Sequence, residues 1–301
     1  VNCITKVKSS NGVFSESLSV FGKAFSGSYS ITIEGSTTLN DSGTSTGTNT
    51  TTTLNDTSKV WTVDIHLERL LYITGGTGSG QLRLIKSNTA TALTVYQQWA
   101  TTPDATSIYK IWTIATSGPS ITTNNAQKSI TAKYITFDKT DAVNAWAQNN
   151  SVLGLTGCKA TAGTDSVLRA NDASIIACSS TVAYSGPRCL AQGYSKISAN
   201  GTVIRNMSAN GIYALDVSWI YLFEGNEVRN NASTGVLLET NSAMFNIPTT
   251  DAGRQNAFNN NGGWGVYADS GSQANGLASG TFTGNTSGTY SANATKYAYA
   301  G

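Results

Sequence analysis

Apolar and polar residues alternate along most of this chain in segments only a few residues long. Such segments include Ile212–Ala214, Ile220–Leu222, Val236–Leu238 and Val266–Ala268, and Asn, Gly and Ser separate them. Alternation at period two places successive side chains on opposite faces of a strand. No stretch keeps the 3.6-residue apolar period of an amphipathic helix over about ten residues. The pattern therefore predicts an all-β protein with short strands.

A spaced pattern recurs four times in the C-terminal third: an apolar residue, two others, then Asn. The four copies are Val203–Asn206, Val228–Asn231, Phe258–Asn261 and Phe282–Asn285, and their Asn residues lie 25, 30 and 24 positions apart. A second series runs in phase with them at Ser174, Ser195, Ser218 and Ser242. Self-similarity at a period of about 20 to 50 residues indicates a repeat architecture.

We therefore predict a right-handed parallel β-helix, in which coils of about 24 residues stack about 4.8 Å apart. The four Asn residues should occupy equivalent corners, with Val203, Val228, Phe258 and Phe282 stacked in the core. The 30-residue step should be one coil plus a loop near Asn246–Arg254. A β-sandwich with evenly spaced turns is the alternative, although it would not produce the in-phase Asn and Ser series.

Three regions follow from changes in composition. Residues 1–58 include a Thr-rich run, Ser36–Thr57, which is too polar to form a core and predicts an extended attachment arm that orders against a partner. Residues 59–118 are predicted to form a small β module, and residues 119–301 the β-helix. We expect a short helix over Asn144–Asn150 to cap the open end of the coils, as repeat stacks require.

Charge and cysteine usage narrow the classes of function. Charged residues make up 12% of the chain and the net charge is +2, which gives no electrostatic basis for binding nucleic acid or an anionic membrane. No apolar run approaches about 18 residues, so no membrane insertion is predicted. The start, Val1–Cys3, shows no signal peptide. The four cysteines, Cys3, Cys158, Cys178 and Cys189, lack zinc-site spacing, so neither a metal nor another cofactor is expected. Buried free thiols and a Cys158–Cys178 bridge both remain open.

A glycine-rich loop, Gly75–Gly80, lies in the central region. The residues after it, Gln81–Ile85, alternate like a strand and do not open a helix, and no Gly-Lys-Ser/Thr follows. The geometry that cradles a phosphate is therefore missing, and a hairpin turn is predicted.

About 50 residues of this region carry a family resemblance, through Gly78–Ile85, Asn88–Val95, Trp99 and Pro103–Tyr109. They resemble a small β module of tail and fibre proteins of tailed bacteriophages. The C-terminal coils are similar to the β-helix shafts of phage tailspikes, which belong to a pectate-lyase-like group. The resemblance implies a homotrimeric fibre or spike in the virion. It further implies that other virion proteins bind the N-terminal region, and that a bacterial surface polysaccharide or protein is the receptor. No pectate-lyase calcium cluster of aspartates is present, so lyase activity does not follow.

Candidate catalytic groups are few. The only histidine, His66, lies outside the coils, and no Gly-x-Ser-x-Gly elbow accompanies it, so a Ser-His-Asp triad is not predicted. Glycoside cleavage needs two carboxyl groups, about 5 to 9.5 Å apart. Neighbouring coils could supply three such pairs, namely Asp216 with Glu239, Glu224 with Glu227, and Asp165 with Asp172. For each of these residues, a solvated position at a strand edge or turn is the favoured interpretation.

Aromatic residues in the coils are candidates for ligand binding. Tyr213, Trp219, Tyr221, Trp264 and Tyr267 fall out of phase with the core positions, so several should point outward. Exposed tyrosine and tryptophan suit sugars or protein loops. In a trimer the same side chains could instead be buried between chains.

The sequence as a whole favours a structural virion protein, a fibre or spike involved in host attachment. One alternative is a tailspike-type polysaccharide depolymerase, a glycosidase or lyase. The other is a secreted β-helix adhesin, which the missing signal peptide disfavours.

Overall fold

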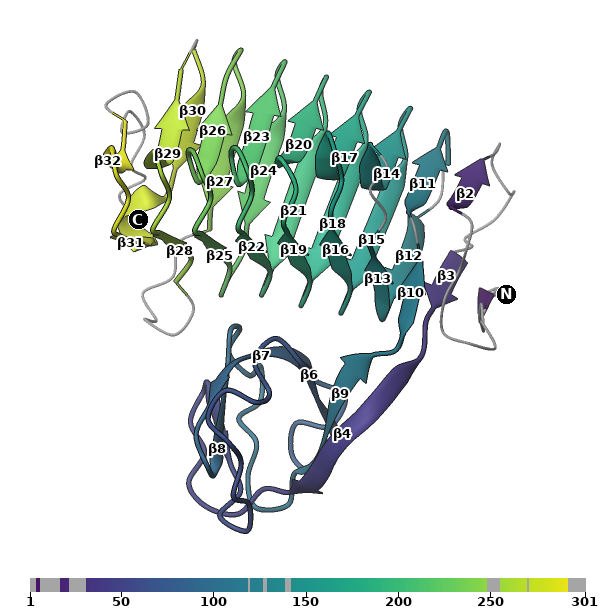
Figure 1. Ribbon diagram of the computed structural model, residues 1–301, viewed down its shortest axis with the longest axis vertical. Coiled ribbons are helices and arrows are strands. Elements are labelled where there is room, and N and C mark those ends of the chain that lie inside the picture. The colour runs from purple at the N-terminus through teal and green to yellow at the C-terminus, as the bar shows by residue number, and fades with distance from the viewer. Residues whose placement is uncertain are drawn as a thin grey trace.

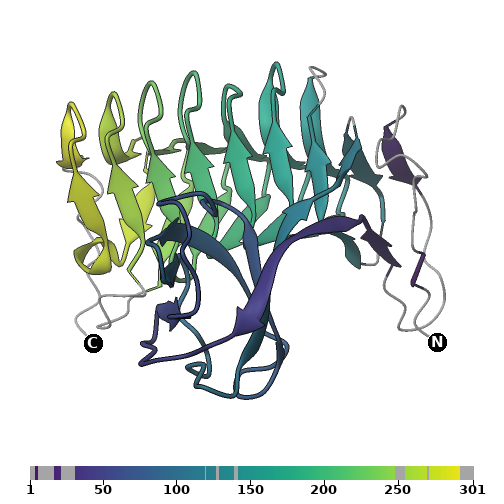
Figure 2. The same cartoon turned by 60° about the horizontal axis from the view of Figure 1, so that its bottom comes forward.

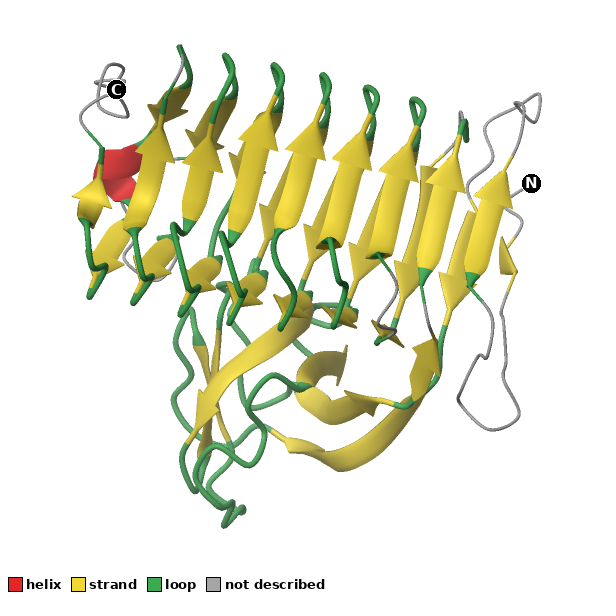
Figure 3. Cartoon of the chain, turned by 45° about the horizontal axis from the view of Figure 1, so that its top comes forward, coloured by secondary structure: helices red, strands yellow, loops and turns green. Residues whose placement is uncertain are grey.

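The chain forms an elongated solenoid of parallel strands with a smaller antiparallel β module against one side (Figure 1). In this computed structural model the described residues are 4–5, 17–21, 31–118, 120–126, 129–138, 142–247, 255–269 and 271–291. Strands dominate, and one 3-10 helix, η1 (Leu277–Ser279), lies near the C-terminal end of the solenoid (Figure 3). The predicted all-β parallel β-solenoid is confirmed, with about seven turns.

Three parallel sheets run along the solenoid, and each coil contributes one strand to each of them in turn. Sheet A contains β1 (Ile4–Thr5), β3 (Ile31–Glu34), β12 (Ser129–Lys133), β15 (Val152–Thr156), β18 (Ile175–Ser179), β21 (Lys196–Asn200), β24 (Trp219–Leu222), β27 (Ala243–Asn246) and β30 (Gln273–Asn275). Sheet B contains β10 (Thr116–Gly118), β13 (Ile135–Phe137), β16 (Lys159–Thr161), β19 (Val182–Tyr184), β22 (Val203–Arg205), β25 (Glu227–Arg229), β28 (Ala257–Asn259) and β31 (Thr281–Thr283). Sheet C contains β2 (Leu18–Phe21), β11 (Ile121–Asn124), β14 (Val143–Gln148), β17 (Ser166–Asn171), β20 (Cys189–Gln192), β23 (Ile212–Leu215), β26 (Val236–Leu238), β29 (Trp264–Ala268) and β32 (Gly288–Tyr290).

Inward-facing side chains stack in columns through the coils. On sheet B one column runs through Ile204, Val228, Phe258 and Phe282. The rings of Phe258 and Phe282 stack with their centroids 4.9 Å apart. Because each coil packs only on its neighbours, this column and the corresponding columns of sheets A and C together provide the hydrophobic stabilisation of the solenoid.

The corner between sheets C and A is built by a serine ladder. Two residues with left-handed backbone precede each Ser from Ser151 to Ser242, as at Asp216 and Val217, whose φ angles are 57° and 60°. The Ser hydroxyl oxygen then accepts a hydrogen bond from the backbone N–H of the equivalent Ser in the preceding coil. The ladder runs through Ser151, Ser174, Ser195, Ser218, Ser242 and Ser272, with N–Oγ distances of 2.9 to 3.1 Å. The in-phase Ser series therefore marks one corner, where it satisfies backbone donors that the turn leaves unpaired.

An asparagine ladder follows sheet B, but its predicted register was wrong in the first coil. The backbone N–H groups of Asn231 and Asn261 donate to the side-chain oxygens of Asn261 and Asn285 at 3.2 and 3.0 Å. Met207, and not Asn206, donates to Asn231. Asn206 lies one position earlier, at a left-handed φ of 54°.

The same one-residue shift moves Val203 out of the solenoid core, where Ile204 takes its place. The error has a physical origin, because the left-handed corner and the ladder position are consecutive and Asn is favoured at both.

The predicted 30-residue step is an insertion between β27 and β28. Paired strands are 24 positions apart before it (Trp219 and Ala243) and 30 across it (Glu227 and Ala257). Residues 248–254 of the predicted loop lie outside the described residues.

The β module is an insertion into the first coil, between β3 and β10. Its strands, in the spatial order β4-β9-β6-β7-β8-β5, are β4 (Thr37–Thr44), β5 (Thr53–Asn55), β6 (Leu70–Gly75), β7 (Leu82–Asn88), β8 (Ala92–Val95) and β9 (Ile108–Ile114). The insertion closes where the Ser36 N–H donates to Thr116 Oγ1 at 2.6 Å.

This arrangement corrects the predicted division at residue 58. Residues 37–55 supply β4 and β5 of the module, whereas β2 and β3 belong to the solenoid. The Thr-rich run does not need a core of its own, because Leu54 is fully buried in the module and its backbone pairs with β8.

The structure also tests the predicted capping helix and the two alternatives for the cysteines. Residues 143–148 form strand β14 and not a capping helix, because Ala145 and Ala147 alternate into the core with period two. Cys158, Cys178 and Cys189 are free and buried, and burial raises the pKa of each thiol. Cys178 lies beside Leu155 in the strand register, so a Cys158–Cys178 bridge is not formed. Cys3 lies outside the described residues.

Candidate functional site

The module lies over the outer face of sheet B (Figures 1 and 2). Val182 and Val203 point outward from the solenoid, yet neither is exposed to solvent. They form one apolar cluster with Leu70, Leu84 and Tyr96 of the module. Outward-facing valines on a solenoid strand are thus explained by a second surface that covers them.

A chain of ion pairs reinforces this apolar contact. Arg205 donates from Nε and Nη2 to the two carboxylate oxygens of Glu68, each at 2.7 Å. Arg229 lies 3.7 Å from Glu68 and 3.0 Å from Glu227, and Lys86 reaches Glu227 at 2.7 Å. The hydrogen bonds to Glu68 raise the pKa of Arg205. Removing charges from water is costly, but here each carboxylate has at least two cationic partners.

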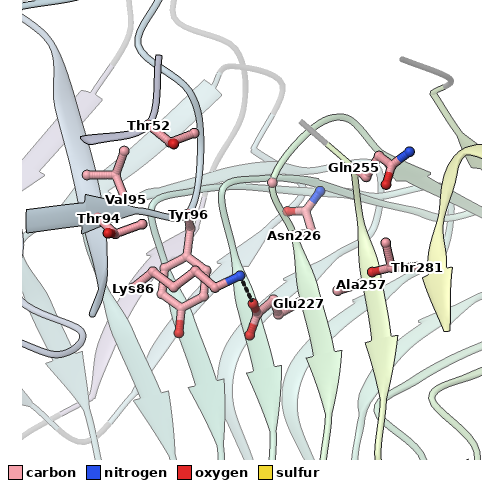
Figure 4. A pocket seen from close by; sticks show the side chains of 11 residues that line it. Thr52, Lys86, Thr94, Val95, Tyr96, Asn226, Glu227, Gln255, Ala257 and Thr281 are labelled. Carbon is pink, nitrogen blue, oxygen red and sulfur yellow. Dashed lines mark ion pairs between the residues drawn. The ribbon is translucent and has the colours of Figure 1, made fainter. Parts of the chain in front are cut away.

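Beside these contacts the two parts leave an open cleft of about 260 Å³ (Figure 4). Its walls are Thr52, Lys86, Thr94, Val95 and Tyr96 of the module, and Gly225, Asn226, Glu227, Gln255, Ala257 and Thr281 of the solenoid. The Lys86–Glu227 ion pair joins the two walls. The Lys86 side chain is 50% exposed, whereas that of Glu227 is only 11% exposed.

Some polar groups that line the cleft are used in hydrogen bonds of the fold, and others remain available to a ligand. The Asn226 amide is used within the solenoid, because Nδ2 donates to Asn256 at 2.9 Å and Oδ1 accepts from the Thr202 N–H. Burial, with the nearby Glu227 carboxylate, raises the pKa of Tyr96 to about 12, so its phenol stays protonated. Hydroxyl groups of threonines, the Gln255 amide and the Lys86–Glu227 pair remain at the surface of the cleft.

Two of the predicted carboxylates, Glu224 and Glu227, lie on the module side of the solenoid. Glu227 is held by Lys86 and Arg229, and Glu224 accepts a hydrogen bond from Gln97 Nε2 at 3.1 Å. Both carboxylates therefore contribute to docking of the module.

The other two predicted pairs lie away from the cleft. Asp216 and Glu239 follow β23 and β26 in adjacent coils, where Asp216 accepts from Gln192 and Glu239 accepts from Tyr213 OH at 2.6 Å. Asp165 and Asp172 flank strand β17, so about 20 Å of extended chain separates them. That separation is too long for paired acid–base catalysis at one glycosidic bond, which uses carboxyl groups about 5 to 9.5 Å apart.

The predicted aromatic residues are partly exposed and divide between two faces. Trp219 and Tyr221 point outward from sheet A, where Tyr221 stacks on Phe245 with ring centroids 4.9 Å apart. Lys196 Nζ lies 4.0 Å from the centre of the Tyr221 ring.

On sheet C, Tyr213 and Tyr267 lie in one outward column with Leu237 between them. The ring centroids of Trp264 and Tyr267 are 6.4 Å apart. Sequence reasoning missed Phe245, and it missed Lys86 and Tyr96 of the cleft. The alternation of β27 would have identified Phe245, whereas no local pattern places the module against sheet B.

The remaining sequence motifs have structural roles. Gly75–Gly80 joins the antiparallel strands β6 and β7, which confirms the predicted hairpin. His66 is buried against Trp61, and Arg69 lies 3.1 Å from its Nδ1 atom. Within the described ranges, no three His, Cys, Asp or Glu side chains gather as a metal site. No helix in the described part of the chain has the length and hydrophobicity of a membrane span.

Comparison with known proteins gives distant structural likenesses. No family model matches the chain, and a search of curated proteins finds no match. The tailspike gp61 of Pseudomonas phage phi297 is similar at 9% identity and a TM-score of 0.27, over 83% of this chain and 51% of that one. The gp54 tailspike of Acinetobacter baumannii bacteriophage AP22, in complex with A. baumannii capsular saccharide, is similar at 12% identity and a TM-score of 0.27, over 93% of this chain and 64% of that one. The tailspike gp49 of Pseudomonas phage LKA1 has 9% identity and a TM-score of 0.21, over 86% and 62%.

The chain thus spans about half to two thirds of the length of these tailspikes. Likenesses of this size assign neither a family nor a ligand to the chain. The parallel β-solenoid is established by the strand pairing of the structure itself.

Proposed function

We propose that this chain is a structural protein of a bacteriophage particle, a fibre or spike that takes part in attachment to the host surface. The observation that carries the proposal is the presence of partly exposed aromatic side chains on two outer faces of a rigid solenoid. On sheet A the stacked rings of Tyr221 and Phe245 form a partly exposed apolar ridge, to which the Tyr221 hydroxyl adds a polar group. The sequence resemblance of the module to phage tail proteins supports the same proposal.

In this proposal the protein is a homotrimer and its N-terminal part contacts other virion proteins. The partner on the host is a bacterial surface polysaccharide or a surface protein. Tyr213, Trp264 and Tyr267 on sheet C and Trp219 and Tyr221 on sheet A are the candidate contact residues. The two faces allow one set of rings to contact a receptor while the other packs against a second chain.

Two measurements test the proposal. Light scattering of the purified protein should give the mass of a trimer, and a monomer at micromolar concentration would count heavily against it. Gold-labelled antibodies against the chain should decorate the tail of virions that contain it and block their adsorption to host cells. Labelling of the capsid alone, with adsorption unchanged, would contradict a role in attachment.

A polysaccharide depolymerase is the second candidate, and one observation favours it. Asp216 and Glu239 are partly exposed carboxylates in adjacent coils, at the corner between sheets C and A. Glycoside hydrolysis uses two carboxyl groups at a short separation. Incubation with a panel of bacterial surface polysaccharides, scored by new reducing ends, tests this candidate. Release of reducing ends that is abolished in both Asp216→Asn and Glu239→Gln would establish an enzyme, and no release would leave the attachment role alone.

A further inference from the structure

The cleft between the module and sheet B has two walls that come from distant parts of the chain. One wall is formed around β7 and β8, and the other around β25, β28 and β31. On sheet B, Glu227, Ala257 and Thr281 continue the same outward column as Val182 and Val203. The module covers the two valines, and the next three positions line the cleft, so the cleft begins where the apolar contact ends.

The charges of the cleft cancel. Lys86 and Glu227 are the charged residues among its lining, and they are paired with each other at 2.7 Å. A ligand with net charge would gain no Coulomb attraction here and would have to displace one partner of this pair. The electrostatics therefore favour a neutral ligand.

The hydrogen-bonding groups of the cleft match a ligand that both donates and accepts. The Lys86 ammonium has three donor positions and the Glu227 carboxylate has about four acceptor positions. Lys86 and Arg229 each occupy one position on Glu227, so both Lys86 and Glu227 keep capacity for a ligand. Thr52, Thr94 and Thr281 add hydroxyl groups, and Gln255 adds an amide. Adjacent hydroxyl groups of one ligand can accept from Lys86 while they donate to Glu227, which apolar or purely anionic ligands cannot do.

Size sets a further limit on the ligand. The volume of about 260 Å³ lies below the range of about 300 to 1,000 Å³ that is typical of pockets for drug-sized ligands. Val95 and Ala257 supply a small apolar surface between the polar groups. This combination suits a single saturated ring that carries several hydroxyl groups.

We propose that the cleft between the module and sheet B binds a neutral polyhydroxylated ring, a pyranose unit of a surface glycan. This inference rests on the proposed attachment function for the source of the ring. It differs in location from the aromatic faces of sheets A and C, and it gives the module a role in recognition. Both walls are required, because the Lys86–Glu227 pair spans them.

Bulky substitutions in the cleft test the inference. Thr281→Trp fills the cleft from the solenoid wall, and Thr52→Trp fills it from the module wall. Thr283→Trp is the matched control, since Thr283 is exposed on the same face of β31 but does not line the cleft. Thermal melts first establish that all three variants are folded. Binding is then measured on an immobilised panel of purified bacterial capsular and O-antigen polysaccharides, with free methyl pyranosides as competitors.

The wild-type protein should bind at least one polysaccharide, and Thr281→Trp and Thr52→Trp should each weaken that binding by about tenfold or more. Thr283→Trp should bind as the wild type does, and a methyl pyranoside of the bound glycan should compete. Wild-type affinity in both cleft variants would overturn the inference and leave attachment through sheets A or C standing. Absence of wild-type binding to every polysaccharide would also overturn it, whereas the attachment role is decided separately by virion labelling and adsorption.

Discussion

Arg205 and Glu68 are 137 residues apart in the chain, and the guanidinium of one donates two hydrogen bonds of 2.7 Å to the carboxylate of the other. This bidentate pair joins the solenoid to the module. Geometry of this kind is the strongest that a side-chain ion pair offers, because two parallel charge-assisted hydrogen bonds form at once. The position of the module, and with it the shape of the cleft, depends on this contact.

Glu68→Gln should therefore destabilise the docked module. The substitution leaves the partly buried Arg205 without its carboxylate and leaves Arg229 with Glu227 alone, and we expect a loss of about 2 kcal/mol. This is less than the ~3–5 kcal/mol of fully buried pairs, because both arginines retain some contact with water. Denaturant titration measures the loss. Lys86→Gln, at a half-exposed pair, is the control and should cost under about 1 kcal/mol. Equal effects would show that Glu68 does not hold the module.

Val228→Asp should disrupt the solenoid. Val228 is 1% exposed, and a carboxylate there would be buried without a partner in a column that several coils share. We expect a cost of several kcal/mol. Thr50→Asp is the contrasting change, because Thr50 is an exposed turn residue whose hydroxyl accepts from the Thr52 and Thr53 N–H groups. Aspartate can accept the same bonds, so stability should stay within about 0.5 kcal/mol. Thermal melts decide, and a large loss in Thr50→Asp would contradict the prediction.

Asn231→Ala should remove one rung of the asparagine ladder. The change leaves the buried N–H of Met207 without an acceptor and removes a donor to Asn261, so we expect a cost of about 2 kcal/mol. Asn230→Gly, one residue earlier, is the matched control. Asn230 is exposed at a φ of 55°, which glycine adopts freely, and its stability should match the wild type. A similar loss in both variants would mean that the corner, and not the ladder, sets the stability.

Val217→Asn should stabilise the protein. Val217 has a φ of 60°, a region that β-branched residues rarely occupy, and the equivalent residue of the next coil is Asn241 at 58°. Asparagine adopts this conformation at lower cost, so the free energy of unfolding should rise by about 1 kcal/mol. The reciprocal change, Asn241→Val, should lower it by a similar amount. Calorimetry of both variants provides the test, and a loss in Val217→Asn would show that its side chain contributes more than its strain costs.

Asp56 should make the stability of the module depend on pH. Burial acts to raise its pKa, but hydrogen bonds from Ser58 and Tyr109 outweigh burial and hold the pKa below the ordinary value of 3.8. A depressed folded-state pKa adds stability above pH 3.8, and that stability is lost as the pH falls through the folded value. The difference in melting temperature between wild type and Asp56→Asn should therefore be largest near neutral pH and shrink below about pH 4. A constant difference across this range would exclude Asp56 as the source.

The repeat could be predicted from the sequence because each ladder of the solenoid requires a particular side chain to accept a backbone hydrogen bond in every coil. Ser174, Ser195 and Ser218 each accept a hydrogen bond from a backbone N–H at the same corner of successive coils. Ser therefore recurs in the sequence once per coil. The asparagine period was harder to place, since Asn206 and Asn231 are both corner residues but serve different positions. The module's location could not be predicted, because the ion pairs of Glu68 with Arg205 and of Lys86 with Glu227 do not recur from coil to coil and so produce no repeated pattern in the sequence. The Thr-rich run was wrongly predicted to be an extended arm for a related reason, since its strands β4 and β5 are stabilised by pairing with β9 and β8, which come later in the chain.

The module enters and leaves the solenoid at one point, where Ser36 meets Thr116. The insertion takes the place of one corner of the first coil, and β3 and β10 on either side of it keep their register with β12 and β13 of the next coil. The loops of this insertion that face away from sheet B can lengthen or shorten without altering the stacking of any coil, whereas the residues that cover Val182 and Val203 are tied to the solenoid. If the protein recognises a host surface as proposed, changes in recognition can accumulate in the outer loops of the module while the stacking of the coils stays the same.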